Sequence, residues 1–328
     1  MSANMLILDT DGGVDDAQAL LMLIAHGRTP DAITTVFGNV GLDVATRNML
    51  DVLAIAGADV PVHMGAAAPM AQPIIDARDV HGEDGLGGAE RPARSADPVS
   101  KDAIGFLRRT LGAHVATAEK VDLLMIGPLT NLAHVLEAEP GLVAGIGQLT
   151  IMGGTVYGRG NTTPAAEFNI FADPEAAAIV FAADINTLVV PWEPCTTHAV
   201  EGAELDALLA AAPDGPVKRF QAAISAHMRK RAIGYGRGDV VQMVDPFAAA
   251  VVIAPGLVTK SIEAAVEVAL APGVTRGMTV IDPSGRLGTP KVTLVESGDL
   301  PQLKALYQGS LSFGSTTKNN QDQTGADL

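Results

Sequence analysis

The sequence is poor in cysteine and in basic residues, and it has no long apolar run. Cys195 is the one cysteine among 328 residues, so no internal disulfide can form, and a reducing cytoplasm is the expected location. Lys and Arg number 22 against 37 Asp and Glu, and the net charge of −15 excludes nucleic acid and anionic membranes as partners. We expect neither a signal peptide nor a membrane-spanning helix, because no segment has the basic start or the apolar length.

What the chain does have is a regular alternation of strand-like and helix-like segments. Hydrophobic residues make up 48% of the chain, enough for one large α/β domain. Strands are expected at 6–8, 33–37, 60–62, 121–126, 148–152 and 186–190, and helices from 15, over 43–56, from 130, from 173 and over 247–253. This alternation predicts one domain, residues 1–313, on a mostly parallel sheet with helices on both faces. The polar tail 314–328 is expected to fray.

The densest group of carboxylates follows the first expected strand. Asp9, Asp11, Asp15 and Asp16 lie within eight residues, directly after the apolar run Leu6–Leu8. Side chains two residues apart on a strand point the same way, so Asp9 and Asp11 share one face at its carboxyl end. Four carboxylates this close repel one another unless a hard divalent cation such as Ca²⁺ lies among them. The motif therefore predicts a metal site at the end of the first strand.

Three other interpretations of this motif are open. Aspartates at a helix start are common caps, which explains Asp15 and Asp16 but leaves Asp9 and Asp11 unexplained. An EF-hand loop needs a glutamate at its twelfth position and a preceding helix, and the sequence has neither here. A phosphatase of the haloacid dehalogenase type also begins with a strand and Asp-x-Asp-Gly, which the segment Asp9–Gly12 resembles.

Further polar residues follow the other expected strands. In an open α/β sheet, ligands lie outside the carboxyl ends of the strands. The sequence places there Asn39, Thr130, Met152-Gly153-Gly154, Glu167-Phe168-Asn169 and Asp245. Each of these alone has an ordinary explanation as a cap, a turn or a loop residue. Their convergence on one rim of the sheet is what indicates a functional site.

Taken together, the motifs resemble the inosine–uridine nucleoside hydrolase family. The resemblance rests on the opening motif, Gly38-Asn39, Gly127-Pro128-Leu129-Thr130-Asn131, Met152-Gly153-Gly154, Ala166–Asn169, Asp173–Ala177 and Asp245-Pro246. The usual proline of the opening motif is Gly12, which only loosens the turn. The resemblance implies a Rossmann-like nucleoside hydrolase fold and a Ca²⁺-dependent enzyme of purine and pyrimidine salvage that splits ribonucleosides into ribose and base. It also implies a homodimer or homotetramer.

The same resemblance implies a role for each matching residue. Asp11 would be the general base, activating a calcium-bound water, and would itself bind the metal. Asp16 and Asp245 would bind calcium through their carboxylates, and Thr130 through its main-chain carbonyl. The residues that would hold the substrate are Asp15, Asn39, Met152, Asn161, Glu167 and Asn169. Asp9 would support the site from behind or touch the metal. Carboxylates suit this reaction because the departing base leaves positive charge on the ribose.

One departure from the family pattern concerns the leaving base. Many members place a histidine directly before the last aspartate to protonate that base, whereas this chain has Val244. The candidates for a replacement acid are His81, Tyr235 and His227. The glycine-rich segment 234–238 indicates either a mobile loop over the site or an ordinary surface turn.

Three functions remain open from the sequence. The first is hydrolysis of the N-glycosidic bond of ribonucleosides. The second is a catalytically weak relative that binds calcium and a ribosyl ligand without turnover, motivated by Val244. The third is an aspartate-dependent phosphatase, which leaves the segments around Thr130 and Glu167 unexplained.

Overall fold

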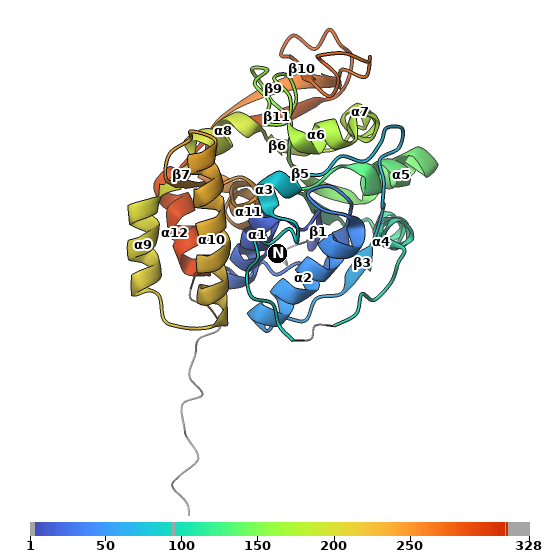
Figure 1. The fold of residues 1–328 in the computed structure, drawn as a ribbon. Coiled ribbons are helices and arrows are strands. Elements are labelled where there is room, and N and C mark those ends of the chain that lie inside the picture. The colour runs from blue at the N-terminus through green and yellow to red at the C-terminus, as the bar shows by residue number, and fades with distance from the viewer. Residues whose placement is uncertain (1–3, 94–95, 312, 314–328) are drawn as a thin grey trace, which may run out of the picture.

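Parallel strands form the middle of a nine-stranded sheet. The computed structural model describes residues 4–93, 96–311 and 313, and its large sheet has the order β10-β9-β11-β6-β5-β4-β1-β2-β3 (Figure 1). All pairs from β3 to β11 are parallel, whereas β9 is antiparallel to β10 and β11. A small antiparallel sheet pairs β7 with β8. The strands are β1 (Met5–Thr10), β2 (Ala32–Thr35), β3 (Val62–Met64), β4 (Val121–Met125), β5 (Ile146–Met152), β6 (Thr187–Val190), β7 (Ala199–Glu201), β8 (Val240–Gln242), β9 (Val258–Val268), β10 (Thr279–Asp282) and β11 (Lys291–Gly298).

Helices cover both faces of this sheet. In Figure 1, α9, α10 and α12 gather on one side of the molecule, and α4, α5 and α7 on the other. The helices are α1 (Val14–Ala25), α2 (Leu42–Ala56), α3 (Arg78–His81), α4 (Ala103–Thr117), α5 (Thr130–Ala138), α6 (Phe168–Ala172), α7 (Pro174–Ala182), α8 (Trp192–Thr197), α9 (Gly202–Ala211), α10 (Pro216–Gly234), α11 (Asp245–Ile253) and α12 (Leu300–Ser310), with 3-10 turns at Pro140–Gly145 and Pro255–Leu257.

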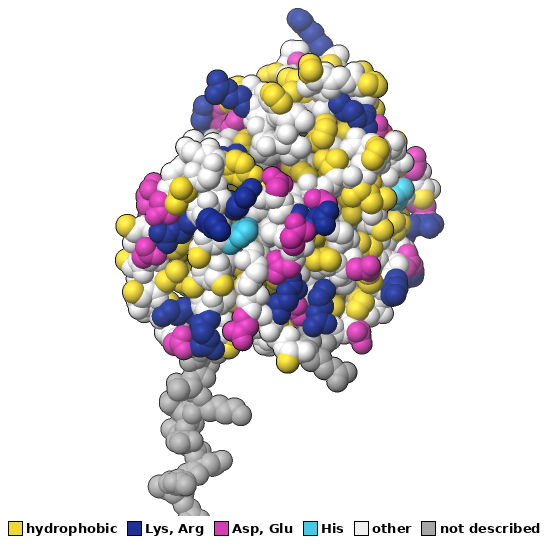
Figure 2. Space-filling view, viewed as in Figure 1, with side chains coloured by type: hydrophobic (Ala, Val, Ile, Leu, Met, Phe, Trp, Pro, Cys, Tyr) yellow, Lys and Arg dark blue, Asp and Glu magenta, His cyan; other side chains and the backbone are white. Residues whose placement is uncertain are grey.

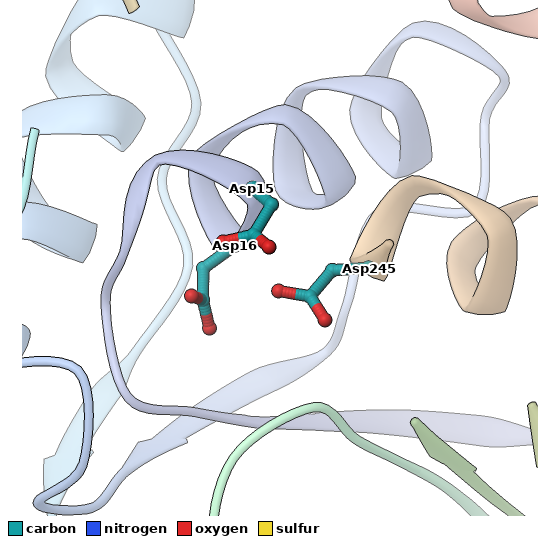
Figure 3. Close-up of side chains that lie close together, drawn as sticks. All are labelled: Asp15, Asp16 and Asp245. Carbon is teal, nitrogen blue, oxygen red and sulfur yellow. The ribbon is translucent and has the colours of Figure 1, made fainter. Parts of the chain in front are cut away.

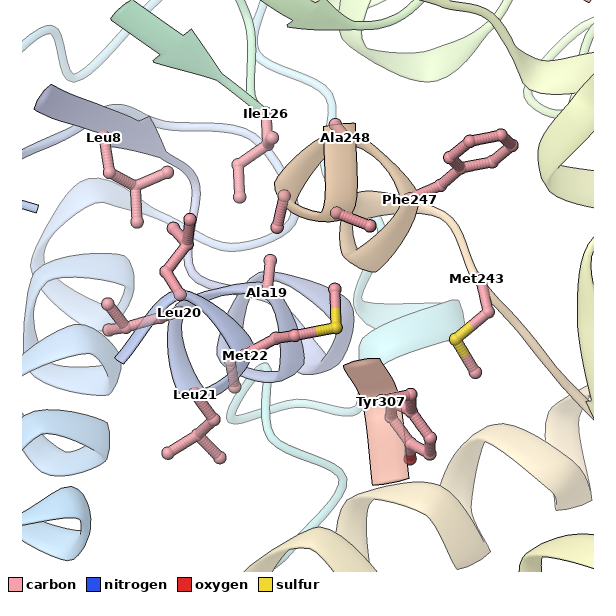
Figure 4. Close-up of a cluster of buried hydrophobic side chains, with 14 of the residues drawn as sticks. Leu8, Ala19, Leu20, Leu21, Met22, Ile126, Met243, Phe247, Ala248 and Tyr307 are labelled. Carbon is pink, nitrogen blue, oxygen red and sulfur yellow. The ribbon is translucent and has the colours of Figure 1, made fainter. Parts of the chain in front are cut away.

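The alternation of side chains along β1 produces two hydrophobic cores. Leu6 and Leu8 pack into the core formed with α1, α2, α10, α11 and α12, whereas Ile7 packs into the core formed with α4, α5 and α7. Figure 4 shows part of the first core, in which Leu8 of β1 and Leu20 of α1 lie on one side and Ala248 of α11 on the other, with Ile126 between them. Burial on both faces explains why the first strand is continuously apolar.

The predicted architecture is confirmed: the chain is a single α/β domain with a mostly parallel sheet covered by helices. Helix α2 ends at Gly57, whose φ of 65° is left-handed, as its glycine predicts. Three details differ. Strand β2 stops at Thr35, because Val36 and Phe37 already turn toward the site, and β3 lies two residues later than expected. The antiparallel strands β9, β10 and β11 were not predicted.

Among the described residues, no helix is both long and apolar enough to cross a membrane. The predicted tail 314–328 lies outside the described residues. The parallel strands β1, β2, β4, β5 and β6 all end at one edge of the sheet, and the segments that follow them carry most of the predicted site.

Candidate active site

Three carboxylates meet at the edge where the parallel strands end. Asp15 and Asp16 lie in the first turn of α1, and Asp245 is the first residue of α11. Figure 3 shows the three side chains directed toward one another, and each offers an oxygen within 4.8 Å of those of the others. Asp15 Oδ1 is buried and has no hydrogen-bond partner among the described residues. An all-oxygen donor set with an unpartnered carboxylate oxygen fits a hard divalent cation.

Asp11 lies directly behind this cluster and is fully buried. Its Oδ2 accepts a hydrogen bond from the Asn39 main-chain N at 2.7 Å, and its Oδ1 accepts one from Asn39 Nδ2 at 2.8 Å. The same Nδ2 donates to Asp16 Oδ2 at 3.1 Å, so Asn39 links two of the aspartates. A Cβ at Gly38 would lie 2.0 Å from Asp11 Oδ2, which explains why glycine precedes Asn39.

Burial raises the proton affinity of the whole group. Desolvation, followed by the charge of Asp16, raises the pKa of Asp11 well above its ordinary value. Desolvation and the charge of Asp15 do the same for the pKa of Asp245. The pKa of Asp15 is raised to about 6 by desolvation, and that of Asp9 to about 7 for the same reason. The protein alone therefore leaves this cluster short of positive charge, which a bound cation would supply.

In front of the cluster is a cavity of about 420 Å³. One part of its lining, which we call the acidic wall, consists of Asp15, Asn39, Met152, Glu167, Asn169 and Asp245. Glu167 begins α6 and accepts hydrogen bonds from the main-chain N of Gly154 at 2.9 Å and of Asn169 at 3.0 Å. Desolvation raises the pKa of Glu167 to about 7. Asn169 Nδ2 donates to the carbonyl oxygens of Met152 at 3.1 Å and Ile126 at 3.2 Å.

Another part of the lining, the arginine wall, consists of Trp192, Arg231, Tyr235, Arg237 and Val244. It is built from the start of α8, the end of α10 and the segment leading into α11. The Arg237 guanidinium lies 5.2 Å from the centre of the Trp192 ring and 5.4 Å from that of Tyr235. On the face shown in Figure 2, Lys and Arg side chains are interspersed with Asp and Glu.

Two of the three candidate acids for the leaving base line the cavity, and the third does not. His81 and Tyr235 line the cavity, and His227 is not among its lining residues. His81 Nδ1 accepts a hydrogen bond from the Val14 main-chain N at 3.2 Å, and desolvation lowers its pKa to about 4. The Tyr235 hydroxyl donates to Asp79 Oδ2 at 3.0 Å. His227 Nε2 lies 2.8 Å from the Val80 carbonyl oxygen.

The structure brings most of the predicted residues together but not Thr130. Asp9, Asp11 and Asp16 lie buried behind the cavity, and the other predicted substrate residues, Asn161 included, line it. The Thr130 hydroxyl donates to Asp173 Oδ2 at 2.7 Å, outside the cavity lining. Because Thr130 is the first residue of α5, its carbonyl is directed along that helix, which argues against the predicted role as a metal ligand.

Two groups of cavity residues were not identified from the sequence, one after parallel strands and one at the end of α10. Ile126 and Trp192 both line it, and each comes within two residues of the end of a parallel strand, β4 and β6. The rule that ligands lie outside strand ends would have found both. Arg231 and Met228 reach the cavity from the end of α10, and no local motif marks them.

Comparisons with known proteins agree with this geometry. The model of the inosine-uridine preferring nucleoside hydrolase family matches residues 6–305. The non-specific ribonucleoside hydrolases RihC of Klebsiella pneumoniae and Salmonella enteritidis are 38% identical over 291 and 293 residues, 88% of this chain and 92% of each relative. A plant nucleoside hydrolase, PpNRh1, superposes with a TM-score of 0.85 at 30% identity, over 94% of this chain and 98% of that one. An inosine-guanosine nucleoside hydrolase gives 0.82 at 26% identity, over 94% and 99%.

Proposed function

Because this chain belongs to the inosine-uridine preferring nucleoside hydrolase family and is a nucleoside hydrolase, we propose that its cavity hydrolyses the N-glycosidic bond of ribonucleosides with the help of a divalent cation. The observation that carries the proposal is the meeting of Asp15, Asp16 and Asp245 at the inner side of a cavity lined by further hydrogen-bonding side chains. The phosphatase alternative is not favoured, because the family match extends over the segments that it leaves unexplained.

We propose Ca²⁺ as the cation, held by Asp16, Asp245 and Asp11. The main-chain carbonyl of Ile126 takes the place that the sequence assigned to Thr130, because Ile126 lines the cavity and Thr130 does not. Carboxylate and carbonyl oxygens are the donors that Ca²⁺ prefers. When bound, the cation would supply Lewis-acid polarisation of the oxygen atoms that it contacts.

The chain's own residues account for the rest of the reaction. Asp15, Asn39, Glu167 and Asn169 provide acceptors and donors for the ribose hydroxyls. When the bond from C1′ to the base nitrogen breaks, its electron pair stays on the base, and the positive charge left on the ribose faces the carboxylates of the acidic wall. Asp11 accepts a proton from the water that adds to C1′, because its carboxylate is buried beside the proposed cation site.

The test is release of free ribose from a panel of purine and pyrimidine nucleosides, with and without a chelator. We expect turnover that a chelator abolishes and that added Ca²⁺ restores, together with a melting temperature that falls on chelation, because the cation binds only the folded state. Full activity in chelator would overturn the metal proposal. Binding of nucleosides without release of ribose would favour the catalytically weak relative instead. The homodimeric or homotetrameric state and the cytoplasmic location stay predictions.

A further inference from the structure

The arginine wall contains a stack of cationic and aromatic side chains. The Arg237 guanidinium contacts the rings of both Trp192 and Tyr235, and the Arg231 guanidinium lies 5.0 Å from the centre of the Tyr235 ring. Trp192 is buried, with 8% of its surface exposed, so it is a fixed partner for the guanidinium. Stacking of this kind holds a guanidinium in one plane while leaving its N–H groups free to donate.

The two arginines differ in how far their charge is neutralised. Arg231 Nη2 donates to the Tyr235 hydroxyl at 2.8 Å and lies 3.9 Å from Asp79 Oδ2. Arg237 Nη1 donates to the neutral Gln242 Oε1 at 3.0 Å, and no described carboxylate forms an ion pair with it. A guanidinium has five N–H donors, so Arg237 keeps several for a ligand. It is thus an unneutralised cation at the edge of a cavity whose other charges are mainly negative.

The candidate side chains near this wall are poorly suited to protonate a leaving base. Val244, directly before Asp245, has no proton to give. The Tyr235 hydroxyl already donates to Asp79. His81 accepts at Nδ1 from the Val14 main-chain N, so its proton is on Nε2, and a neutral imidazole of this kind is a much weaker acid than an imidazolium. The cavity therefore offers a fixed positive charge where a proton donor was expected.

We propose that Arg237 binds the base and stabilises the negative charge that the base acquires as its bond to ribose breaks. The electron pair of the C1′–N bond stays on the base, which leaves as an anion hydrogen-bonded to the guanidinium. Water adds to C1′ and loses one proton to Asp11. After the base anion has left, it takes up one proton, so the charges balance over the whole reaction. This inference rests on the proposed function, and it replaces acid catalysis by electrostatic stabilisation of the leaving group.

The chemistry of a guanidinium also selects the base. Its N–H groups need acceptors, and the negative charge of a departing uracil or hypoxanthine spreads onto carbonyl oxygens. Adenine has no carbonyl oxygen and presents an amino group, which is itself a donor. We therefore expect this stabilisation to be larger for bases with carbonyl oxygens, in agreement with the inosine-uridine preference named for the matching family.

The test compares a natural substrate with one whose leaving group needs no help. Wild type, Arg237→Met and Arg237→Lys are assayed on uridine and on p-nitrophenyl riboside, with Arg219→Met as the matched control. Arg219 lies on α10, pairs with Asp214 at 2.7 Å and is not among the lining residues of the cavity. We expect Arg237→Met to lower kcat on uridine at least about 30-fold and to change p-nitrophenyl riboside less than about threefold, by analogy with loss of one charge-stabilising donor. Arg237→Lys should fall between, and adenosine should be the poorest substrate of the wild type.

Each other outcome decides against the inference or its premise. Equal losses on both substrates would show that Arg237 only supports the fold, and no loss on uridine would remove it from the reaction. A loss on uridine 5′-monophosphate alone would assign the guanidinium to a phosphate instead. If the wild type releases ribose from no nucleoside, the proposed function fails and the inference fails with it. If the wild type is active and Arg237→Met matches it, the inference alone fails.

Discussion

The two walls of the cavity differ in burial and in how they are built. Glu167 and Asp245 of the acidic wall are 2% and 3% exposed, whereas Tyr235 of the arginine wall is 47% exposed. Most of the acidic wall comes from segments that follow parallel strands, so the large sheet fixes much of its geometry, whereas Asp245 follows β8 of the small antiparallel sheet. The arginine wall comes largely from the end of α10 and the loop beyond it. On the proposed function, the wall that would hold the ribose is the buried one, and the wall that would meet the base is partly exposed and lies on a loop, where sequence changes are better tolerated.

Glycines account for the shape of the adjustable part. Gly236 and Gly238 have φ values of 70° and 87°, a region that other residues rarely adopt. These two positions flank Arg237 and allow the chain to turn twice within a few residues. A Cβ at either position would meet open space, so the requirement is conformational rather than steric.

Replacing Asp11, the proposed general base behind the acidic wall, should have the largest effect on catalysis. Asp11→Asn keeps the size of the side chain but cannot accept a proton, so we expect kcat to fall by about 10²–10⁴-fold. The loss should be similar on uridine and on p-nitrophenyl riboside, because water attacks the same carbon in both. Asp9→Asn, a buried carboxylate on the same strand outside the cavity lining, is the matched control and should lose much less. If Asp11→Asn lowered kcat on uridine but not on p-nitrophenyl riboside, Asp11 would be acting on the leaving base, which is the function assigned to the arginine wall.

The acidic wall could be predicted from the sequence to a large extent, and the arginine wall could not. Asn39, and Asp11 behind it, sit in short motifs after β2 and β1, whose ends the parallel sheet brings to one edge. Asp245 follows β8 of the small antiparallel sheet, and its Asp-Pro motif alone marks it in the sequence. The position of Thr130 disfavours its predicted role as a metal ligand. Only four residues separate the end of β4 from the start of α5, and the direction of a main-chain carbonyl there depends on where the helix begins. Arg237 contacts the ring of Trp192, which lies far away in the sequence, and a contact between distant segments leaves no local pattern.

Burial of the acidic wall should also give the protein a pH-dependent stability to which the arginine wall contributes nothing. The pKa of Glu167 rises from an ordinary 4.5 to about 7 on folding. Its contribution to stability is therefore fully present below about pH 4.5 and is lost as the pH rises through about 7. In chelated protein, Glu167→Gln should recover roughly 2–3 kcal/mol at pH 8 and little at pH 4, which denaturant unfolding at the two pH values measures.

Arg237→Met is the control for this pH effect. Because Arg237 is exposed and unpaired with any described carboxylate, its loss should leave the difference in unfolding free energy between pH 4 and pH 8 unchanged. A Glu167→Gln protein with the same pH profile as the wild type would show that Glu167 ionises without penalty in the folded state. The deeper burial of the acidic wall would then have no effect on the ionisation of its carboxylates.

The smallest effect is expected from restoring the family's histidine in the arginine wall. Val244→His adds a proton donor beside Asp245, but Arg237 already stabilises the leaving base, and its charge disfavours a protonated imidazole nearby. We therefore expect kcat/KM on uridine to rise by less than about tenfold and that on p-nitrophenyl riboside to stay constant, which narrows the gap between the substrates. Val244→Asn, of similar size but without an acidic proton, should show no rise. In the Arg237→Met background the same histidine should help uridine more, because the guanidinium no longer stabilises the leaving base or disfavours imidazolium. A large rise in the wild-type background, of the order of a hundredfold, would mean that the native cavity gives the departing base no help, and that the arginine wall serves another purpose.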